Sequence, residues 1–236
     1  MAPPAAATQD DFEHPYVTVD LVTFTAEEQG LHLLVLERDE EPAGWALPGA
    51  FVQMDEDVAD TASRVGREKL GIQQVPDLIA LQPFGAQDRD PRRRVITLPH
   101  LALLPAAHAP STRALAPFAA SWAHLHATTG DEEMVFTIEG SEVQLVFDHE
   151  QIVREALTEV RRRVHLDDPM LYRHLLPDTF TLRQLQTVHE ALLGTTVNRD
   201  SFRRRVLMSG RLDQTDERET DVEHRPASLY RWRTPR

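Results

Sequence analysis

Short apolar runs separated by polar segments dominate the chain as far as residue 148. The runs are rich in Val, Leu, Ile, Phe and Thr, a composition typical of β-strands. One amphipathic helix is expected over 57–70, whereas 105–130, rich in Ala, His and Pro, favours a long loop or a poor helix. The predicted strands cover residues 17–24, 31–38, 75–84, 94–104, 133–138 and 143–147. Strands interrupted by one good helix predict a mixed α/β domain.

The pattern changes at Asp148, after which apolar residues recur at helical spacing. Asp148 is the expected N-cap of a helix that runs to about His165. A second helix is expected over 180–194, ended by its last glycine, and a third over 198–210. Two strand-like segments follow, at 211–215 and 227–233. Helix, short connection, helix and hairpin together predict a winged helix-turn-helix.

The two patterns predict an α/β (α+β) chain of two modules joined by a helix. We expect a disordered tail over 1–13, a mixed-sheet domain over 14–148, a linking helix over 149–168 and a winged helix-turn-helix domain over 169–236. The net charge of −13 argues against a nucleic-acid partner, but the distribution of charge does not. Residues 178–236 carry 11 Arg against 9 acidic residues, so this module has the composition expected of a different partner.

Composition also excludes several classes of protein. The chain has no cysteine, which excludes disulfide scaffolds and thiolate-bound metal or iron–sulfur sites. It has no apolar run of about 18 residues, so no membrane partner is expected. The first residues do not combine a basic segment with an apolar core, so they do not predict a secretory signal. A cytoplasmic protein is the expectation.

Residues 50–72 have the spacing of a phosphate- and metal-binding motif. They resemble the Nudix box, whose pattern is Gly-x5-Glu-x7-Arg-Glu-U-x-Glu-Glu-x-Gly-U, where U is apolar. Five of its nine defined positions match, namely Glu56, Arg64, Glu68, Gly71 and Ile72. Ala50, Val65, Gly66 and Lys69 stand at the other four. The resemblance implies a mixed-sheet α/β/α sandwich in which Glu56 and Arg64 form a structural ion pair.

The metal-binding half of this motif is largely missing. Positions 65, 68 and 69 are neighbours on one helix face, where three carboxylates would form a hard-oxygen site for Mg²⁺. Here they are Val65, Glu68 and Lys69, with a formal charge of zero instead of −3. We therefore expect no catalytic residue, no metal site and no catalytic Mg²⁺. A chance loop and helix with acidic residues is the alternative interpretation of the whole stretch.

Further motifs make the resemblance more specific. RDPR at 89–92 lies between two predicted strands, as it does in ADP-ribose-type Nudix proteins. Together with FDHEQI at 147–152 and the C-terminal segments from 180 onward, it resembles the NrtR-type Nudix-related transcriptional regulators over residues 14–233. The resemblance implies a Nudix-like effector domain and a winged helix that binds double-stranded operator DNA as a homodimer. It also implies control of NAD-metabolism genes, or of sugar catabolism as in some relatives, by ADP-ribose or a related nucleotide or sugar phosphate.

Candidate effector-binding residues come from both halves of the first module. Two arginines of RDPR suit a diphosphate, because guanidinium groups pair with phosphate oxygens. An aromatic ring could stack on adenine, and Trp45 is one candidate beside two others, although each is equally a candidate for the core. The expected effector-binding residues are Arg89, Arg92, Phe51, Tyr16 and Glu68.

The third C-terminal helix carries the candidate DNA contacts. Phe202 and Val206, widened by Leu207, would form its buried face, and the arginines would point away from it. Arginine contacts phosphates and the edges of guanine. The expected DNA-binding residues are Asn198, Arg199, Ser201, Arg204 and Arg205, with Arg225 from the wing. The wing loop at 216–226 has five acidic residues, which weakens the expected contact of the wing.

The sequence leaves three functions open. The favoured one is a ligand-responsive regulator, a repressor rather than an activator, whose Nudix-like domain is catalytically inactive. The first rival is an active ADP-ribose pyrophosphatase with metal ligands from Glu56, Glu68 and residues outside the box. The second rival is a binding module whose C-terminal helices contact protein, with the Arg-rich helix simply solvated.

Overall fold

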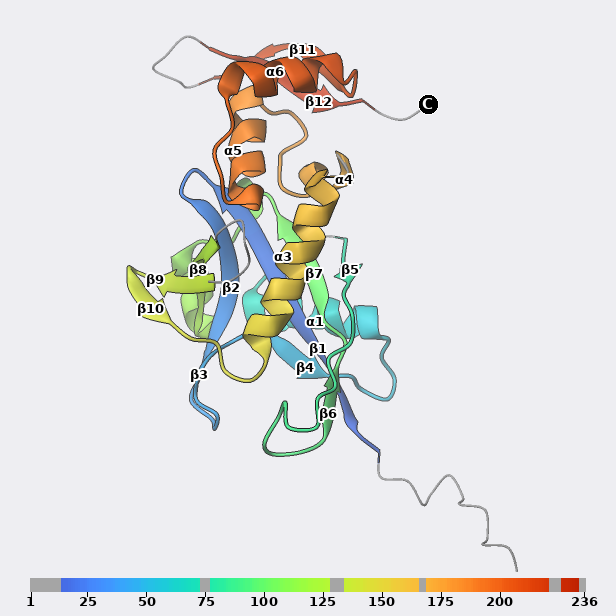
Figure 1. Ribbon diagram of the computed structural model, residues 1–236. Coiled ribbons are helices and arrows are strands. Elements are labelled where there is room, and N and C mark those ends of the chain that lie inside the picture. The colour runs from blue at the N-terminus through green and yellow to red at the C-terminus, as the bar shows by residue number, and fades with distance from the viewer. Residues whose placement is uncertain (1–13, 73–76, 128–133, 166–168, 221–225, 234–236) are drawn as a thin grey trace, which may run out of the picture.

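The computed structural model describes residues 14–72, 77–127, 134–165, 169–220 and 226–233. A sheet with helices on both faces forms one end of the molecule, and two helices and a hairpin form the other (Figure 1). Helix α3 (His149–His165) runs from the first part toward the second. None of the helices in the described segments is both long enough and apolar enough to cross a membrane. The predicted tail over 1–13 lies outside the described residues.

The sheet is mixed, as predicted. Its strands are β1 (Tyr16–Glu27), β2 (Gly30–Arg38), β3 (Gly44–Ala46), β4 (Gly49–Phe51), β5 (Ile79–Ala80), β6 (Val95–Thr97), β7 (His100–Leu104), β8 (Ala120–Ala127), β9 (Met134–Ile138) and β10 (Ser141–Val143). The main order is β10-β9-β8-β2-β1-β7-β5, with β3 beside β2 and both β4 and β6 beside β1. β1 pairs in parallel with β6 and β7 and antiparallel with β2 and β4.

Strand β8 corrects the prediction of a loop or poor helix over 105–130. Its Ala123 and Leu125 are buried, and the strand pairs antiparallel with β2 on one side and β9 on the other. Alanine and histidine have little intrinsic preference for strands, so the segment depends on neighbours on both edges. The preceding residues do form short helices, η2 (Ala106–His108), α2 (Thr112–Leu115) and η3 (Ala116–Phe118).

Three other predicted strands are shorter than expected. Of the run over 75–84, the structure describes residues 77–84, and these yield only β5. The run over 94–104 divides into β6 and β7 before His100, at Pro99, which has no amide to donate to the ladder. The last pair ends with β10 at Val143, after which Leu145 makes only an isolated bridge with Trp45.

The helices cover opposite faces of the sheet. Helix α1 (Val58–Leu70) buries Ala62, Val65 and Leu70 against one face. Helix α3 buries Ile152, Val153, Ala156, Leu157 and Val160 against the other. The result is the three-layered α/β/α arrangement that the sequence predicted.

The winged helix-turn-helix is also confirmed as a fold. It contains α5 (Leu182–Leu193), α6 (Arg199–Met208), β11 (Leu212–Arg218) and β12 (Ser228–Trp232), preceded by α4 (Pro169–Arg173). A capping box between Thr181 and Gln184 starts α5, and Gly194 ends it with a φ of 66°. Asn198 caps α6 by accepting a hydrogen bond from the Ser201 amide at 3.0 Å.

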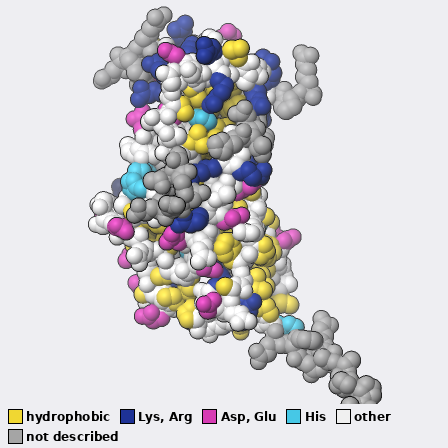
Figure 2. Space-filling model, in the orientation of Figure 1, with side chains coloured by type: hydrophobic (Ala, Val, Ile, Leu, Met, Phe, Trp, Pro, Cys, Tyr) yellow, Lys and Arg dark blue, Asp and Glu magenta, His cyan; other side chains and the backbone are white. Residues whose placement is uncertain are grey.

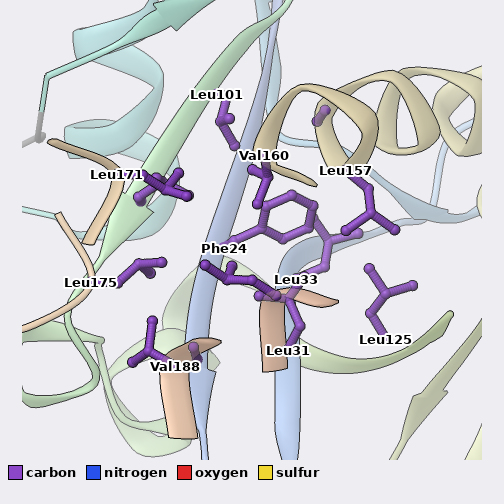
Figure 3. Packing of buried hydrophobic residues seen from close by; sticks show 14 of the residues in the cluster. Phe24, Leu31, Leu33, Leu101, Leu125, Leu157, Val160, Leu171, Leu175 and Val188 are labelled. Atoms are coloured by element: carbon purple, nitrogen blue, oxygen red, sulfur yellow. The ribbon is translucent and has the colours of Figure 1, made fainter. Parts of the chain in front are cut away.

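One hydrophobic cluster joins the two ends of the molecule. Figure 3 shows residues of the sheet, of α3 and of the C-terminal part around the ring of Phe24. Those labelled are Phe24, Leu31, Leu33, Leu101, Leu125, Leu157, Val160, Leu171, Leu175 and Val188. Burial of one such side chain contributes about 1.5–3 kcal/mol of stability. Separating the winged helix from the sheet would expose several of them and lose the sum of these contributions. Helix α3 is therefore part of the shared core as well as a connection.

Candidate functional site

The structural half of the Nudix-like box is intact. Arg64 donates to both carboxylate oxygens of Glu56, at 2.7 and 2.9 Å, and to the Phe51 carbonyl oxygen at 3.1 Å. Thr61 donates a further hydrogen bond to Glu56. The Arg64 guanidinium thereby lowers the pKa of Glu56 to about 2. This pair fixes the loop before α1. Asp57 stands at the N-cap of that helix, but its side chain accepts no capping hydrogen bond.

The residues at the metal positions do not fit Mg²⁺. The Val65 side chain is buried in the core, and Glu68 is 65% exposed with its carboxylate 3.7 Å from Arg64. The Lys69 ammonium donates to the Gly49 carbonyl oxygen. Burial lowers the pKa of Lys69, and nearby arginines lower it further. Lys69 and the neighbouring Arg64 are both cations, and Glu68 is the one carboxylate left. These residues do not supply the cage of oxygen atoms that Mg²⁺ requires.

A cavity of about 510 Å³ opens beside the box, between β1, the β3–β4 segment and the RDPR loop. Its size suits a small-molecule ligand. Five cationic side chains line it against three acidic ones. The cationic residues are Arg38, Arg64, Lys69, Arg89 and Arg92. The cavity is therefore suited to an anionic ligand.

The floor of the cavity is a buried charge network. Arg89 donates to both oxygens of Asp148, at 2.8 and 2.9 Å, and to Asp20 at 3.3 Å. His149 accepts a hydrogen bond from the Leu47 amide through Nδ1, so its proton resides on Nε2, 3.8 Å from Asp20. Burial lowers the pKa of His149, which favours this neutral form. The network connects β1, the RDPR loop and the first residues of α3.

Asp148 thus differs from its predicted role. Its backbone carbonyl accepts from the amides of Gln151 and Ile152 at the start of α3, but its carboxylate pairs with Arg89. Sequence spacing indicated a helix cap because Asp stood before a helical pattern. The partner, 59 residues away, was visible only in the fold.

Phe147 marks the mouth of the cavity. Its ring lies between two guanidinium groups, with Arg38 Cζ 5.3 Å and Arg92 Cζ 5.4 Å from the centroid. Its φ of 60° is left-handed, which is unusual for an aromatic residue. Arg92 also pairs with Asp90 at 2.8 Å, which lowers the pKa of that carboxyl. Neither Phe147 nor Arg38 was among the site residues expected from the sequence.

The predicted effector residues are only partly brought together. Arg89, Arg92 and Phe51 line the cavity, whereas Tyr16 and Glu68 do not. Tyr16 is 52% exposed and meets the Phe51 ring edge to face, 5.6 Å between centroids. Tyr16 therefore contacts a residue that lines the cavity without lining it itself. Trp45, the third aromatic candidate, packs against the hydrophobic core.

The predicted DNA-contact residues lie on α6 at the far end of the molecule. Figure 2 shows several Lys and Arg side chains at this end, where α6 and the β11–β12 hairpin lie. Arg199, Ser201 and Arg204 are exposed, and so is Asn198, although its side chain caps the helix. Arg225 lies outside the described residues.

The buried face of α6 is narrower than predicted. Phe202 is buried and Val206 half-buried, but Leu207 is 41% exposed, so it does not widen the face. Arg205 is exposed as expected, but part of its guanidinium also contacts this face. Its Cζ lies 5.4 Å from the centroid of the Phe202 ring, and its Nη2 lies 3.1 Å from His189 Nε2. The contact is made by His189 of α5, whose ring also lies 5.0 Å from the Phe202 ring.

Two family models match the chain. The NUDIX domain model matches residues 14–167, and the model of the NrtR DNA-binding winged helix domain matches residues 172–232. Between them they cover both parts of the fold in the same order.

Individual proteins are also similar to this chain. A relative from Acinetobacter baylyi, named ADPR responsive transcriptional repressor NtrR, is 30% identical over 95% of this chain and 84% of its own. The structure of Shewanella oneidensis NrtR complexed with a 27mer DNA is 30% identical, with a TM-score of 0.68 over 92% of this chain and 93% of that one. A MutT/nudix family protein from Enterococcus faecalis is 23% identical, with a TM-score of 0.77 over 98% and 95%, and supports the fold alone. The chain belongs to the NrtR family, which joins a NUDIX domain to an NrtR winged helix domain.

Proposed function

We propose that this protein is a DNA-binding transcriptional repressor whose NUDIX domain senses ADP-ribose or a related nucleotide. The observation that carries the proposal is the pairing of an exposed Arg-rich helix α6 with a cationic cavity in one continuous fold. NAD-metabolism genes are the proposed targets. The proposed division is an effector domain over 14–148, a linking helix over 149–168 and a DNA-binding domain over 169–236.

The surface of α6 supports DNA as the partner. Its exposed arginines include Arg199, Arg203 and Arg204. The N-terminus of the helix is capped by Asn198. A winged helix places such a helix in the major groove, where arginine reads guanine or contacts phosphate. The Shewanella oneidensis relative was crystallised with a 27mer DNA. The acidic residues of β11, such as Asp216 and Glu217, favour the helix over the wing as the main contact.

The cavity supports an anionic nucleotide as the effector. Arg92 and Arg38 flank its mouth, and Phe51 adds an aromatic surface beside them. Arg89 is already paired with two carboxylates, so we propose that it holds the floor while Arg92 contacts the diphosphate. The Acinetobacter baylyi relative is named ADPR responsive, which agrees with this ligand.

We further propose that the domain senses its ligand without hydrolysing it. Val65 and Lys69 occupy two of the three metal positions, and the remaining carboxylate, Glu68, lies outside the cavity. Family membership alone does not decide this point, because NUDIX domains also occur in hydrolases such as the pyrophosphatase considered above.

Ligand binding would act on DNA affinity through α3. The Asp148 carboxylate bonds Arg89 on the cavity floor, while the other end of α3 packs beside α5 of the winged helix. We propose a homodimer in which the ligand shifts the population toward a geometry that does not match two half-sites of an operator.

The test is selection of bound sequences from a random pool of double-stranded DNA, followed by affinity measurements with and without ADP-ribose. We expect a palindromic site whose affinity falls at saturating ADP-ribose, with AMP, which lacks the diphosphate, as the control ligand. Arg92→Ala should lessen the response to ADP-ribose while DNA affinity without ligand stays unchanged. A selected site that binds equally well with and without ADP-ribose would contradict the sensing role.

A second measurement separates the regulator from the hydrolase. We expect no Mg²⁺-dependent release of AMP from ADP-ribose. Robust turnover that disappears in Glu68→Gln would favour the pyrophosphatase instead.

A further inference from the structure

A buried histidine lies directly beneath the DNA-facing helix. His189 of α5 is 5% exposed, and both of its ring nitrogens have partners. Nδ1 lies 2.7 Å from the Tyr172 hydroxyl of α4, and Nε2 lies 3.1 Å from Nη2 of Arg205 on α6. The imidazole therefore connects α4 to an arginine on the helix proposed to enter the groove.

The partners fix the protonation state of the ring. A guanidinium has only donors, so Arg205 donates and His189 Nε2 must accept with its lone pair. A neutral imidazole then carries its proton on Nδ1, which donates to the Tyr172 hydroxyl oxygen. An imidazolium has no lone pair on either nitrogen and cannot accept from Arg205. The contact therefore exists only while His189 is neutral.

The same contacts hold Arg205 in one place. Its Cζ lies 5.4 Å from the centroid of the Phe202 ring, and that ring lies 5.0 Å from the His189 ring. Only one of the five guanidinium donors points to His189, which leaves the others available at the exposed surface. An arginine side chain loses rotamer entropy when it is immobilised, and part of that cost is met here before DNA arrives.

We propose that His189 is a positioning residue that presents Arg205 to DNA, and that it does so only in its neutral form. The proposal rests on DNA binding by α6, which is part of the proposed function. It assigns no direct DNA contact to His189, because the ring is buried beneath Phe202 and Arg205.

The surroundings determine what protonation would do. A cavity of about 50 Å³ adjoins the ring, lined by α4, α5, α6 and β12. Among the described residues that line it, the ionisable or charged groups besides His189 are Tyr172, Arg205 and Arg211. None of the described residues lining this cavity is a carboxylate. A proton on His189 would therefore add a cation beside two guanidiniums and remove the acceptor that holds Arg205.

Two substitutions at one position test the positioning role. His189→Gln places an amide oxygen near the position of Nε2, so it keeps an acceptor that does not titrate. His189→Leu fills the same space without an acceptor. At pH 8 and fixed salt we expect His189→Leu to bind the selected DNA about 3- to 10-fold more weakly than wild type, and His189→Gln within about 2-fold, as the net contribution of one typical hydrogen bond suggests.

The pH profile gives a readout that a merely structural role would not move. Lowering the pH from 8 until His189 gains its proton should reduce wild-type affinity toward that of His189→Leu. His189→Gln should lose less affinity over the same interval. General protonation would strengthen DNA binding through charge, so the expected change has the opposite sign.

The controls separate this inference from the function on which it rests. Melting temperatures of both variants, followed over the same pH range, identify loss of folding. Wild-type protein that binds no DNA would overturn the proposed function itself. Wild-type binding with equal affinities and equal pH profiles for both variants would overturn the role of His189 alone.

Discussion

Helices α1 and α6 both display arginines, but they use them in opposite ways. On α1, Arg64 is held by two hydrogen bonds to Glu56 and a third to the Phe51 carbonyl oxygen. On α6, Arg203 and Arg204 are exposed and, within the described part of the chain, have no carboxylate partner. The first arrangement fixes a loop, and the second leaves charge available for a ligand outside the chain.

The two helices also suit different ligands. Helix α1 keeps the ion pair of a Nudix box but presents Val65, Glu68 and Lys69 where a metal would need carboxylates. Helix α6 buries only Phe202, leaves Val206 half-buried, and exposes its other side chains. An arginine therefore indicates a function only when its partners are known, and the following substitutions test that distinction.

The largest effect is expected at the most enclosed arginine. Arg89→Met would leave Asp20 and Asp148 buried without their cation, which costs about 3–5 kcal/mol of unfolding free energy for a buried pair that loses one partner. Denaturant unfolding measures this change. Arg204→Met, at an exposed position, is the matched control and should lie within about 0.5 kcal/mol of wild type. Equal stabilities of the two variants would show that the floor network contributes little.

A smaller effect on a different quantity is expected at the surface of α6. Arg204→Ala should weaken DNA binding by about 1–3 kcal/mol, roughly 5- to 150-fold, and leave stability unchanged. If Arg204 contacts a phosphate, the dependence of affinity on salt should also become shallower. Arg67→Ala, at an exposed arginine of α1, is the control and should bind DNA as wild type does. Indistinguishable affinities for these two variants would favour a protein-contact module.

The smallest effect is expected for the ion pair of α1 and concerns acid. Because Arg64 lowers the pKa of Glu56 from 4.5 to about 2, the pair stabilises the fold above about pH 4.5 and loses this contribution as pH falls toward 2. Glu56→Gln should therefore be less stable than wild type at neutral pH, with the difference narrowing in acid. Melting temperatures of both proteins from pH 7 to pH 3 measure the difference. The Glu159 ion pairs titrate in the same range but cancel in this comparison. A constant difference across the range would contradict this assignment.

Local patterns predicted most of the elements. Helices α3, α5 and α6 follow from apolar spacing of three and four, and Asn198 and Gly194 close helix ends as their types suggest. Strand β8 was missed because its alanines and histidines form a strand only between β2 and β9. The 75–84 run was overestimated because apolar residues there serve the core without extending a ladder.

The sequence by itself determined the order of the two domains, the degenerate box and the Arg-rich helix, because each depends on residues close together in the chain. The tertiary structure decided which charges are available. It paired Arg89 with Asp148, set Phe147 between Arg38 and Arg92, and placed His189 beneath Arg205. Those contacts join residues 16 to 109 positions apart, so their geometry follows from how the sheet and helices pack and not from any local spacing.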